Sequence, residues 1–355
     1  TPSSIFYLNS LFYLPSAKYF LFNFTSVYIL GFANIILLKR THSFFNYFKI
    51  KKQNIDLTNY LSLFSLIFVN IFFYRIAEHG TDRSAQILIF LLVIELLALA
   101  KLKRIKSTDL FNVYLLGAFI ISLKAFYILY VILIIPLILL IKSRKQDYIK
   151  IINFLIFNKF FVLFLILLFF VLFSYFVNTG CLIYPLSITC FDSLNWSIPS
   201  EQVQTMNNWY ELWAKGGAAP NFRVSNPDHY ILGFNWVNNW IDIYFFNKVS
   251  DFILGLLLLI IIVVIFFRKE FFKEKSNKVN KHIYITYFII LILGFEWFYN
   301  HPSLRYGGYC IVALLFFIPV CLKLNTKNID FKKYTSSVFI LIFITMMVFN
   351  VRNIM

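Results

Sequence analysis

The segment "YRIAEHGTDRSAQ" concentrates charges of both signs and an imidazole between two long apolar runs. Its two carboxylates, Glu78 and Asp82, are four residues apart and could bind a divalent cation or act as a base. Arg83 could hold a phosphate, and His79 is a further candidate substrate ligand. The same charges could instead pair with one another in a solvated turn. Because two apolar helices need only a turn between them, the charge cluster favours a functional site, with Asp82 as lead carboxylate and Glu78 as its helper.

A second group of candidate ligands lies far along the chain from this segment. Lys124 interrupts one long apolar stretch, where its ammonium could snorkel to the interface or bind a lipid phosphate. The sequence "HPSLRYGG" adds an imidazole, a guanidinium and a phenol. A diphosphate next to hydrocarbon needs several cations, because each unpaired charge there is costly. The predicted phosphate and substrate ligands are therefore Arg83, Lys124, Arg305, His79, His301 and Tyr306.

The composition sets the environment of these residues. The 355 residues are 60% hydrophobic and only 14% charged, and the mean hydropathy is +0.75. Repeated apolar runs of this kind predict an all-α, polytopic membrane helical bundle. A net charge of +17 could indicate a nucleic-acid partner. The basic residues lie in alternate loops between apolar runs, however, so the predicted partner is the lipid bilayer and not nucleic acid.

Ten membrane segments are predicted, and the basic loops orient them. Alternate loops hold 24 of the 33 Lys and Arg residues, and the positive-inside rule makes those loops cytoplasmic. The charged segment, Lys124 and "HPSLRYGG" then face outward. Glu95, inside the third segment, is expected to form a structural hydrogen bond. The predicted segments are 18–38, 57–77, 85–100, 109–123, 125–141, 160–178, 251–267, 283–299, 308–322 and 335–350.

The chain divides into three parts, of which the middle one is a long external loop. Residues 1–178 and 251–355 hold the membrane helices, and residues 179–250 form the loop. Within it, "SIPSEQVQTMNNWYELWAKGG" predicts a helix that lies on the membrane surface. Cys181 and Cys190 bracket eight residues on the external side, where an oxidising compartment allows a disulfide.

Four segments carry a resemblance to a known family: "SSIFYLNSLFYLP", "EHGTDRSAQ", "GCLIYPLSITCFD" and "HPSLRYGG". They resemble a family of bacterial multispanning membrane proteins that is similar to the GT-C type membrane glycosyltransferases. The resemblance implies a polyprenyl-phosphate-linked sugar donor, a glycan or lipid acceptor, and a location in the bacterial inner (plasma) membrane with the motifs on the periplasmic side. It also implies an N-terminally truncated chain, whose main catalytic carboxylate lies before Thr1. The segment 78–83 departs from the pattern, since it holds E-x-x-x-D and no DxD.

These observations favour a GT-C-like glycosyltransferase that modifies a cell-surface glycan or lipid. A divalent cation is a candidate cofactor, with Glu78 and Asp82 as its candidate ligands. An O-antigen or polysaccharide polymerase or ligase is the first alternative, since it also combines many helices with one large outer loop. A non-catalytic lipid or solute transporter is an alternative of another class. It is disfavoured because only Glu95 places a polar group at mid-membrane.

Overall fold

The structure is a bundle of helices with one short pair of strands. The computed structural model describes residues 3–16, 24–41, 52–74, 80–102, 105–136, 138–139, 153–218, 222–273 and 281–355. Its elements, in chain order, are α1 (Ser4–Leu11), α2 (Phe24–Thr41), β1 (Lys52–Ile55), α3 (Leu57–Phe72), α4 (Gly80–Leu99), η3 (Ser107–Leu110), α5 (Phe111–Leu123), η4 (Ala125–Ile134), α8 (Lys159–Thr179), η5 (Ser187–Thr189), α9 (Ser200–Lys215), α10 (Pro227–Ile231), α11 (Val237–Trp240), η6 (Ile241–Val249), α12 (Ser250–Phe266), α13 (Arg268–Phe271), α14 (Lys281–Asn300), η7 (Leu304–Tyr306), α15 (Gly308–Leu324), β2 (Thr326–Asp330) and α16 (Phe331–Ile354).

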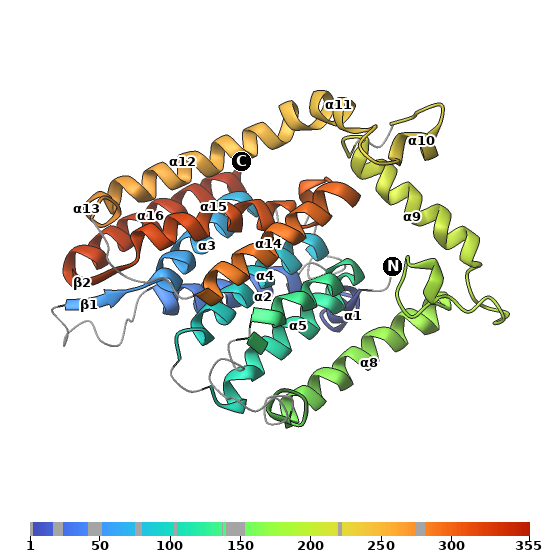
Figure 1. The fold of residues 1–355 in the computed structure, drawn as a ribbon, viewed down its shortest axis with the longest axis horizontal. Coiled ribbons are helices and arrows are strands. Elements are labelled where there is room, and N and C mark those ends of the chain that lie inside the picture. Colours follow the sequence, from blue (N-terminus) through green and yellow to red (C-terminus); the bar gives the residue numbers. More distant parts are fainter. Residues whose placement is uncertain are drawn as a thin grey trace.

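Each of the ten predicted segments coincides with a helix, and the long loop lies at one end of the bundle (Figure 1). We call this the loop end, and the opposite end, with β1 and β2, the strand end. Within the described residues, four helices are long and apolar enough to cross a membrane, namely Lys159–Thr179, Val237–Phe266, Lys281–Asn300 and Phe331–Ile354. The helical class is therefore confirmed, and the apolar helices indicate a membrane protein. That all ten segments cross the membrane stays a prediction.

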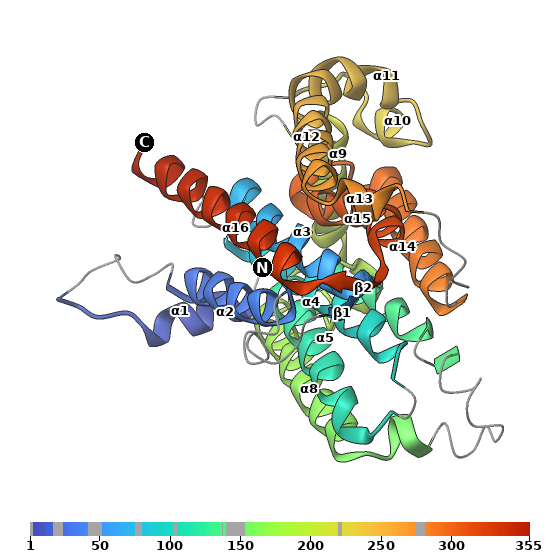
Figure 2. The same cartoon turned by 90° about the vertical axis from the view of Figure 1, so that its left-hand side faces the viewer.

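Two kinds of apolar helix make up the bundle. Helices α3 and α4 are buried on nearly all sides, with α2, α15 and α16 packed against α3 and with α2, α5 and α15 packed against α4 (Figure 2). Helix α8 is as apolar as these two but leaves Phe169 and Phe170 more than 60% exposed. A helix that is apolar all round is stable either in a protein core or against lipid. Helix α8 therefore presents its side chains to hydrocarbon.

The apolar stretch around Lys124 forms two helices, as the sequence predicts. Helix α5 ends at Leu123, η4 begins at Ala125, and Lys124 between them has an extended backbone. The break stops the two helices from continuing as one rod that would be longer than the hydrocarbon core of a bilayer. It also leaves the Lys124 side chain at the loop end.

The strand end carries polar interactions that tie helices together. Strands β1 and β2 pair antiparallel, so the structure is not strictly all-α. The Asp56 side chain caps α3 by accepting from the backbone amides of Thr58 and Asn59, and it also pairs with Lys101 at 2.7 Å. Glu95 accepts a hydrogen bond from Arg40 of α2, so its structural role is confirmed. Each pair joins elements that lie far apart in the chain.

The long loop contains a helix and a disulfide at the predicted positions. Helix α9 covers Ser200–Lys215. Cys181 and Cys190 are joined by a disulfide with an S–S distance of 2.12 Å. The predicted boundary at residue 250 falls inside a continuous helix, because α11, η6 and α12 follow one another without a break from Val237 to Phe266. The last part of the loop, from Val237 onward, therefore continues directly into the next membrane helix.

The orientation of the bundle can be checked with two cysteine reporters. Ser193 is exposed at the loop end, and Lys269 is exposed in α13 at the strand end. The basic loops predict that Ser193→Cys reacts with a membrane-impermeant maleimide in intact cells and that Lys269→Cys does not. Both should react after permeabilisation, which controls for accessibility. The reverse pattern in intact cells would place the loop end in the cytoplasm.

Candidate functional site

Three predicted site residues meet at the loop end. Asp82 lies in the first turn of α4, Lys124 between α5 and η4, and Arg305 in η7. One Asp82 carboxylate oxygen accepts a hydrogen bond from Lys124 Nζ, and the other accepts one from Arg305 Nε. The partners are 42 and 223 residues away from Asp82 in the chain. We call these three residues the charged cluster.

The carboxylate of the charged cluster is buried, whereas its two cations are partly exposed. The Asp82 side chain is 1% exposed, whereas those of Lys124 and Arg305 are 28% and 40% exposed. Two cations face one carboxylate, so one positive charge is left without a counter-charge within the cluster. A carboxylate at the first turn of a helix is also stabilised by the helix dipole. The carboxylate therefore fixes the two cations, and the cations are the groups that a ligand can reach.

Gln86, one turn along α4 from Asp82, holds the Arg305 segment in place. Its side-chain nitrogen donates to the Arg305 carbonyl at 3.0 Å, and its side-chain oxygen accepts from the Cys310 amide at 3.0 Å. Gln86 is fully buried. The sequence prediction missed this residue, although its position four residues after Asp82 places both on one helix face. The segment that carries Arg305 is thus bound to α4 in two ways. The Arg305 side chain bonds to Asp82, and backbone groups of the segment bond to Gln86.

The two glycines after Tyr306 allow this segment to turn tightly. Gly307 has a φ of 107°, a left-handed conformation that favours glycine. A side chain at Gly308 would lie within 2.3 Å of the Trp297 ring. The Trp297 indole nitrogen in turn donates to the Ser303 carbonyl at 2.8 Å. The "RYGG" sequence therefore shapes the turn that aims Arg305 at Asp82.

Aromatic rings from the bundle and from the long loop gather beside Lys124. The Lys124 ammonium lies 4.0 Å from the centre of the Tyr306 ring. Trp213 of α9 packs against Tyr306 at 5.6 Å between ring centres, and His301 does so at 5.8 Å. That helix α9 lies on the membrane surface stays a prediction, and its Trp213 also packs against the aromatic neighbour of the charged cluster. No sequence pattern predicts this contact.

Lys215, at the end of α9, anchors that helix. It is fully buried, and its ammonium donates to Glu211 and to the Ile231 carbonyl, the latter at 2.7 Å. The ammonium also lies 5.4 Å from the Trp236 ring centre. A buried ammonium needs such partners, because an unpaired charge in a protein interior is costly. Lys215 therefore ties the end of α9 to α10 and to the Trp236 segment of the long loop.

His301 is a neutral group beside the charged cluster. Burial, together with the positive charges of Lys124 and Lys215, lowers the pKa of His301 to about 4. Its Nδ1 atom is buried and has no hydrogen-bond partner within the described part of the chain. At neutral pH the imidazole is therefore uncharged and can offer a lone pair or an N–H group to a ligand.

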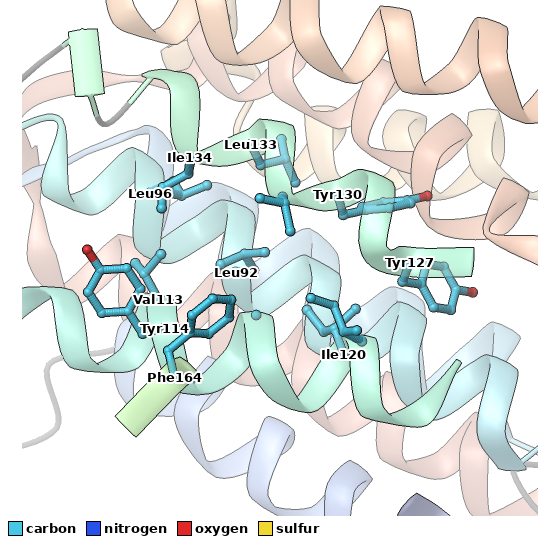
Figure 3. Close-up of a pocket in the computed structure, with 13 residues that line it drawn as sticks. Leu92, Leu96, Val113, Tyr114, Ile120, Tyr127, Tyr130, Leu133, Ile134 and Phe164 are labelled. Carbon is cyan, nitrogen blue, oxygen red and sulfur yellow. The ribbon is translucent and has the colours of Figure 1, made fainter. Parts of the chain in front are cut away.

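The hydroxyls of Tyr127 and Tyr130 add two further buried polar groups. Both side chains come from η4, and neither hydroxyl bonds to any of the residues that the structure describes. Figure 3 shows both hydroxyls pointing away from the leucine and isoleucine side chains of an adjacent apolar cavity of about 40 Å³. The Tyr130 hydroxyl lies near Gly307, where an added side chain would approach it to 2.9 Å. Sequence reasoning missed both tyrosines, because they sit in an uninterrupted apolar run.

The other predicted site residues are not part of the charged cluster. Glu78 and His79 lie outside the described residues. Arg83 follows Asp82 on α4 and is partly buried. The described residues contain no group of three or more His, Cys, Asp or Glu side chains that could hold a metal ion. Both Asp82 oxygens bind cationic side chains, so the proposed metal role of Asp82 would require these bonds to break.

The pKa of His301 predicts a pH dependence of stability. The folded protein keeps this imidazole neutral down to about pH 4, whereas the unfolded chain binds the proton near pH 6.5. The unfolded state then binds more protons over this range, so stability falls as the pH falls from 6.5 towards 4. We expect the melting temperature of the wild type to drop more steeply over this interval than that of His301→Asn. If the melting temperatures of the two proteins fall in parallel with pH, His301 does not contribute to the pH dependence of stability.

Comparisons with known proteins define the family of the chain. A family model described as a domain of unknown function, DUF8201, matches residues 2–312, so the chain belongs to this family. No curated protein and no solved structure shows significant similarity to the chain. The match includes all three residues of the charged cluster.

Proposed function

We propose that this protein is a GT-C-like membrane glycosyltransferase that uses a polyprenyl-phosphate-linked sugar at the loop end. The acceptor would be a cell-surface glycan or lipid, and the loop end would face the periplasm of a bacterial inner membrane. The observation that carries the proposal is the charged cluster, in which Lys124 and Arg305 share one buried carboxylate and remain partly exposed. The ten helices would then all act as membrane segments.

A phosphate suits the charged cluster for reasons of charge and of hydrogen bonding. The excess positive charge calls for an anion, and low dielectric surroundings strengthen that attraction. An ammonium has three donors and a guanidinium has five, so both side chains retain donors after binding Asp82. A lipid phosphate could therefore accept hydrogen bonds from both cations at once. Tyr306 and Trp213 beside them could stack on a sugar.

The proposal gives Asp82 a positioning role. Sequence reasoning made it the lead catalytic carboxylate, but a base must reach the proton that it removes. A carboxylate that is 1% exposed and bonded through both oxygens is poorly placed for this task. Asp82 would instead hold Lys124 and Arg305 at the spacing that a phosphate requires. The acceptor would be activated by another group.

The interior of the bundle favours an enzyme over a transporter. Asn34 and Asn70 exchange two hydrogen bonds between α2 and α3. A transport path needs polar groups that are open to a substrate near mid-membrane. In the described part of the bundle these groups satisfy one another, which supports a site at the surface.

Reconstitution of the full chain in proteoliposomes tests the proposal. The wild type is expected to bind polyprenyl phosphate more tightly than the uncharged polyprenol, and to transfer sugar from polyprenyl-phosphate-linked hexoses. Lys248→Gln, which removes an exposed ammonium at the same end, serves as control for charge. Equal affinity for the phosphate and the alcohol would contradict a phosphate site. Tight phosphate binding without transfer from any donor would contradict the glycosyltransferase assignment.

A further inference from the structure

A groove runs along α8, and no residue of the charged cluster lines it. Its inner part, lined by α1, α5 and α8, has a volume of about 380 Å³. An adjoining hollow of about 450 Å³ is lined by α1, the end of α8 and the long loop. Tyr7 lines both, so the two hollows adjoin at this residue. Volumes of this size are typical of small-molecule and lipid sites.

The inner part of the groove is apolar and borders on lipid. Leu115 and Ala118 of α5 line one wall, and Leu167 and Phe170 of α8 line the other. Phe170 is 61% exposed on a helix that is long and apolar enough to cross a membrane. A groove beside such a helix opens into the bilayer, so hydrocarbon chains are the molecules that reach it. Filling it would bury apolar surface that otherwise faces an incompletely packed space.

The outer part of the groove is polar but uncharged. The Tyr7 hydroxyl shares a hydrogen bond of 3.0 Å with the Ser174 hydroxyl, and the Asn178 side-chain nitrogen donates to Tyr7 at 3.2 Å. Thr179 and Tyr184 line the same hollow. The lining drawn from the described residues includes no charged side chain. Hydroxyl and amide groups of this kind can form hydrogen bonds with the hydroxyl groups of a lipid head group. They carry no positive charge that could neutralise a phosphate.

The mouth of the groove and the charged cluster share one end of α5. The Ser3 hydroxyl donates to the Leu123 carbonyl at 2.6 Å, and the Ser4 and Ser122 hydroxyls lie 2.7 Å apart. These bonds fix α1 to the last turn of α5, directly before Lys124. The head group of a lipid in the outer part of the groove would therefore lie at the same end of the bundle as a phosphate bound to Lys124.

We propose that this groove binds one membrane lipid with an uncharged, hydroxyl-bearing head. The hydrocarbon chain lies between α5 and α8, and the head, a sugar or a glycerol, lies at Tyr7 and Asn178. The lipid site is argued from its own lining and stands apart from the charged cluster. Its further assignment as the acceptor site rests on the proposed glycosyltransferase function. In that case the hydroxyl of the bound head is the group that receives the sugar.

Photo-crosslinking with lipids that carry a diazirine in the chain tests the site. The full chain in nanodiscs is labelled with glucosyl-diacylglycerol, diacylglycerol or phosphatidylglycerol probes, and labelled peptides are mapped by mass spectrometry. We expect labels on α5 and α8 with the two uncharged probes. Unlabelled glucosyl-diacylglycerol should compete for them, and phosphatidylglycerol should not. Stronger labelling by the glucosyl probe would identify a sugar head, and equal labelling by both uncharged probes would identify the glycerol hydroxyl.

Two matched variants separate the groove from the general lipid surface. Leu167→Trp fills the inner part and is expected to weaken labelling at least about tenfold, which corresponds to about 1.4 kcal/mol. Leu165→Trp adds the same ring to an exposed face of α8 outside the groove and should leave labelling unchanged. Asn178→Leu, at the mouth, should reduce the preference for uncharged heads while the protein remains folded. It keeps the proposal testable if Leu167→Trp fails to fold.

The outcomes distinguish this inference from the proposed function. Equal competition by phosphatidylglycerol, or equal labelling of Leu167→Trp and Leu165→Trp, would overturn the lipid site. Lys124→Gln should leave groove labelling intact, because its side chain does not line the groove. Groove labelling in a protein that transfers no sugar would keep the lipid site and remove its role as acceptor site.

Discussion

Replacing Asp82 by asparagine is expected to destabilise the folded protein by about 3 kcal/mol, the lower end of the range for breaking a buried ion pair. The substitution leaves Lys124 and Arg305 facing each other with no counter-charge between them. The lower end applies because both cations keep contact with solvent, which screens part of their repulsion. Denaturant titration in mixed micelles measures the effect. Asp242→Asn, which alters an exposed carboxylate at the same end, should change stability little.

A second substitution shows whether the loss comes from charge. The double variant Asp82→Asn, Lys124→Met restores the original net charge of the cluster, so it should be more stable than Asp82→Asn alone. Such recovery is a coupling energy between the two positions, as expected for residues in direct contact. If the two effects simply add, the ion pair contributes no coupling, and Asp82 would act through another contact.

Much of the fold follows from the apolar runs, because burial and lipid contact both require them. The runs that became α8 and α12 are long and uniform, and the single charge at Lys124 marks the break between α5 and η4. The strand pair was not predicted. Its strands lie in basic loops whose composition indicates only which side of the membrane they occupy. Two loops separated by most of the chain come together only when the helices between them have packed.

The residues of the charged cluster were predictable, but their pairing was not. A carboxylate, a lysine and an arginine at the ends of apolar helices are conspicuous in a chain with 14% charged residues. The nearest cation to Asp82 in the sequence is Arg83, and local pairing was the natural alternative. The partners are Lys124 and Arg305, because the ends of α5 and α15 are placed beside α4 by helix packing. The same packing brings three further polar side chains close to the charged cluster, so the sequence alone does not predict their positions. They are Gln86, Tyr127 and Tyr130.

Neutralising both cations is expected to have the largest effect on function. Under the proposed function, the double variant Lys124→Gln, Arg305→Gln should lower the rate of sugar transfer by at least about 100-fold, the loss typical of removing one preorganised donor to developing charge. Each single variant should retain a measurable part of the activity. Transfer from a polyprenyl-phosphate-linked sugar in proteoliposomes measures the effect, and Lys248→Gln is the control. The double variant also leaves Asp82 buried without a cation, so its folding must be checked by thermal unfolding in detergent.

Arg305→Lys distinguishes a phosphate ligand from a purely structural cation. It keeps the positive charge that Asp82 requires, so the folded protein should lose little stability. It removes the planar guanidinium, whose fixed donors can bind Asp82 through Nε and a phosphate through the remaining N–H groups at the same time. A lysine at this position keeps donors for both partners, but they lack the fixed planar geometry that holds a phosphate at a defined distance from Asp82. We therefore expect Arg305→Lys to fold normally, to lose part of its preference for polyprenyl phosphate over polyprenol, and to transfer sugar more slowly. Normal transfer by a folded Arg305→Lys variant would show that Arg305 serves only to neutralise Asp82, and it would leave Lys124 as the sole cation of the proposed phosphate site.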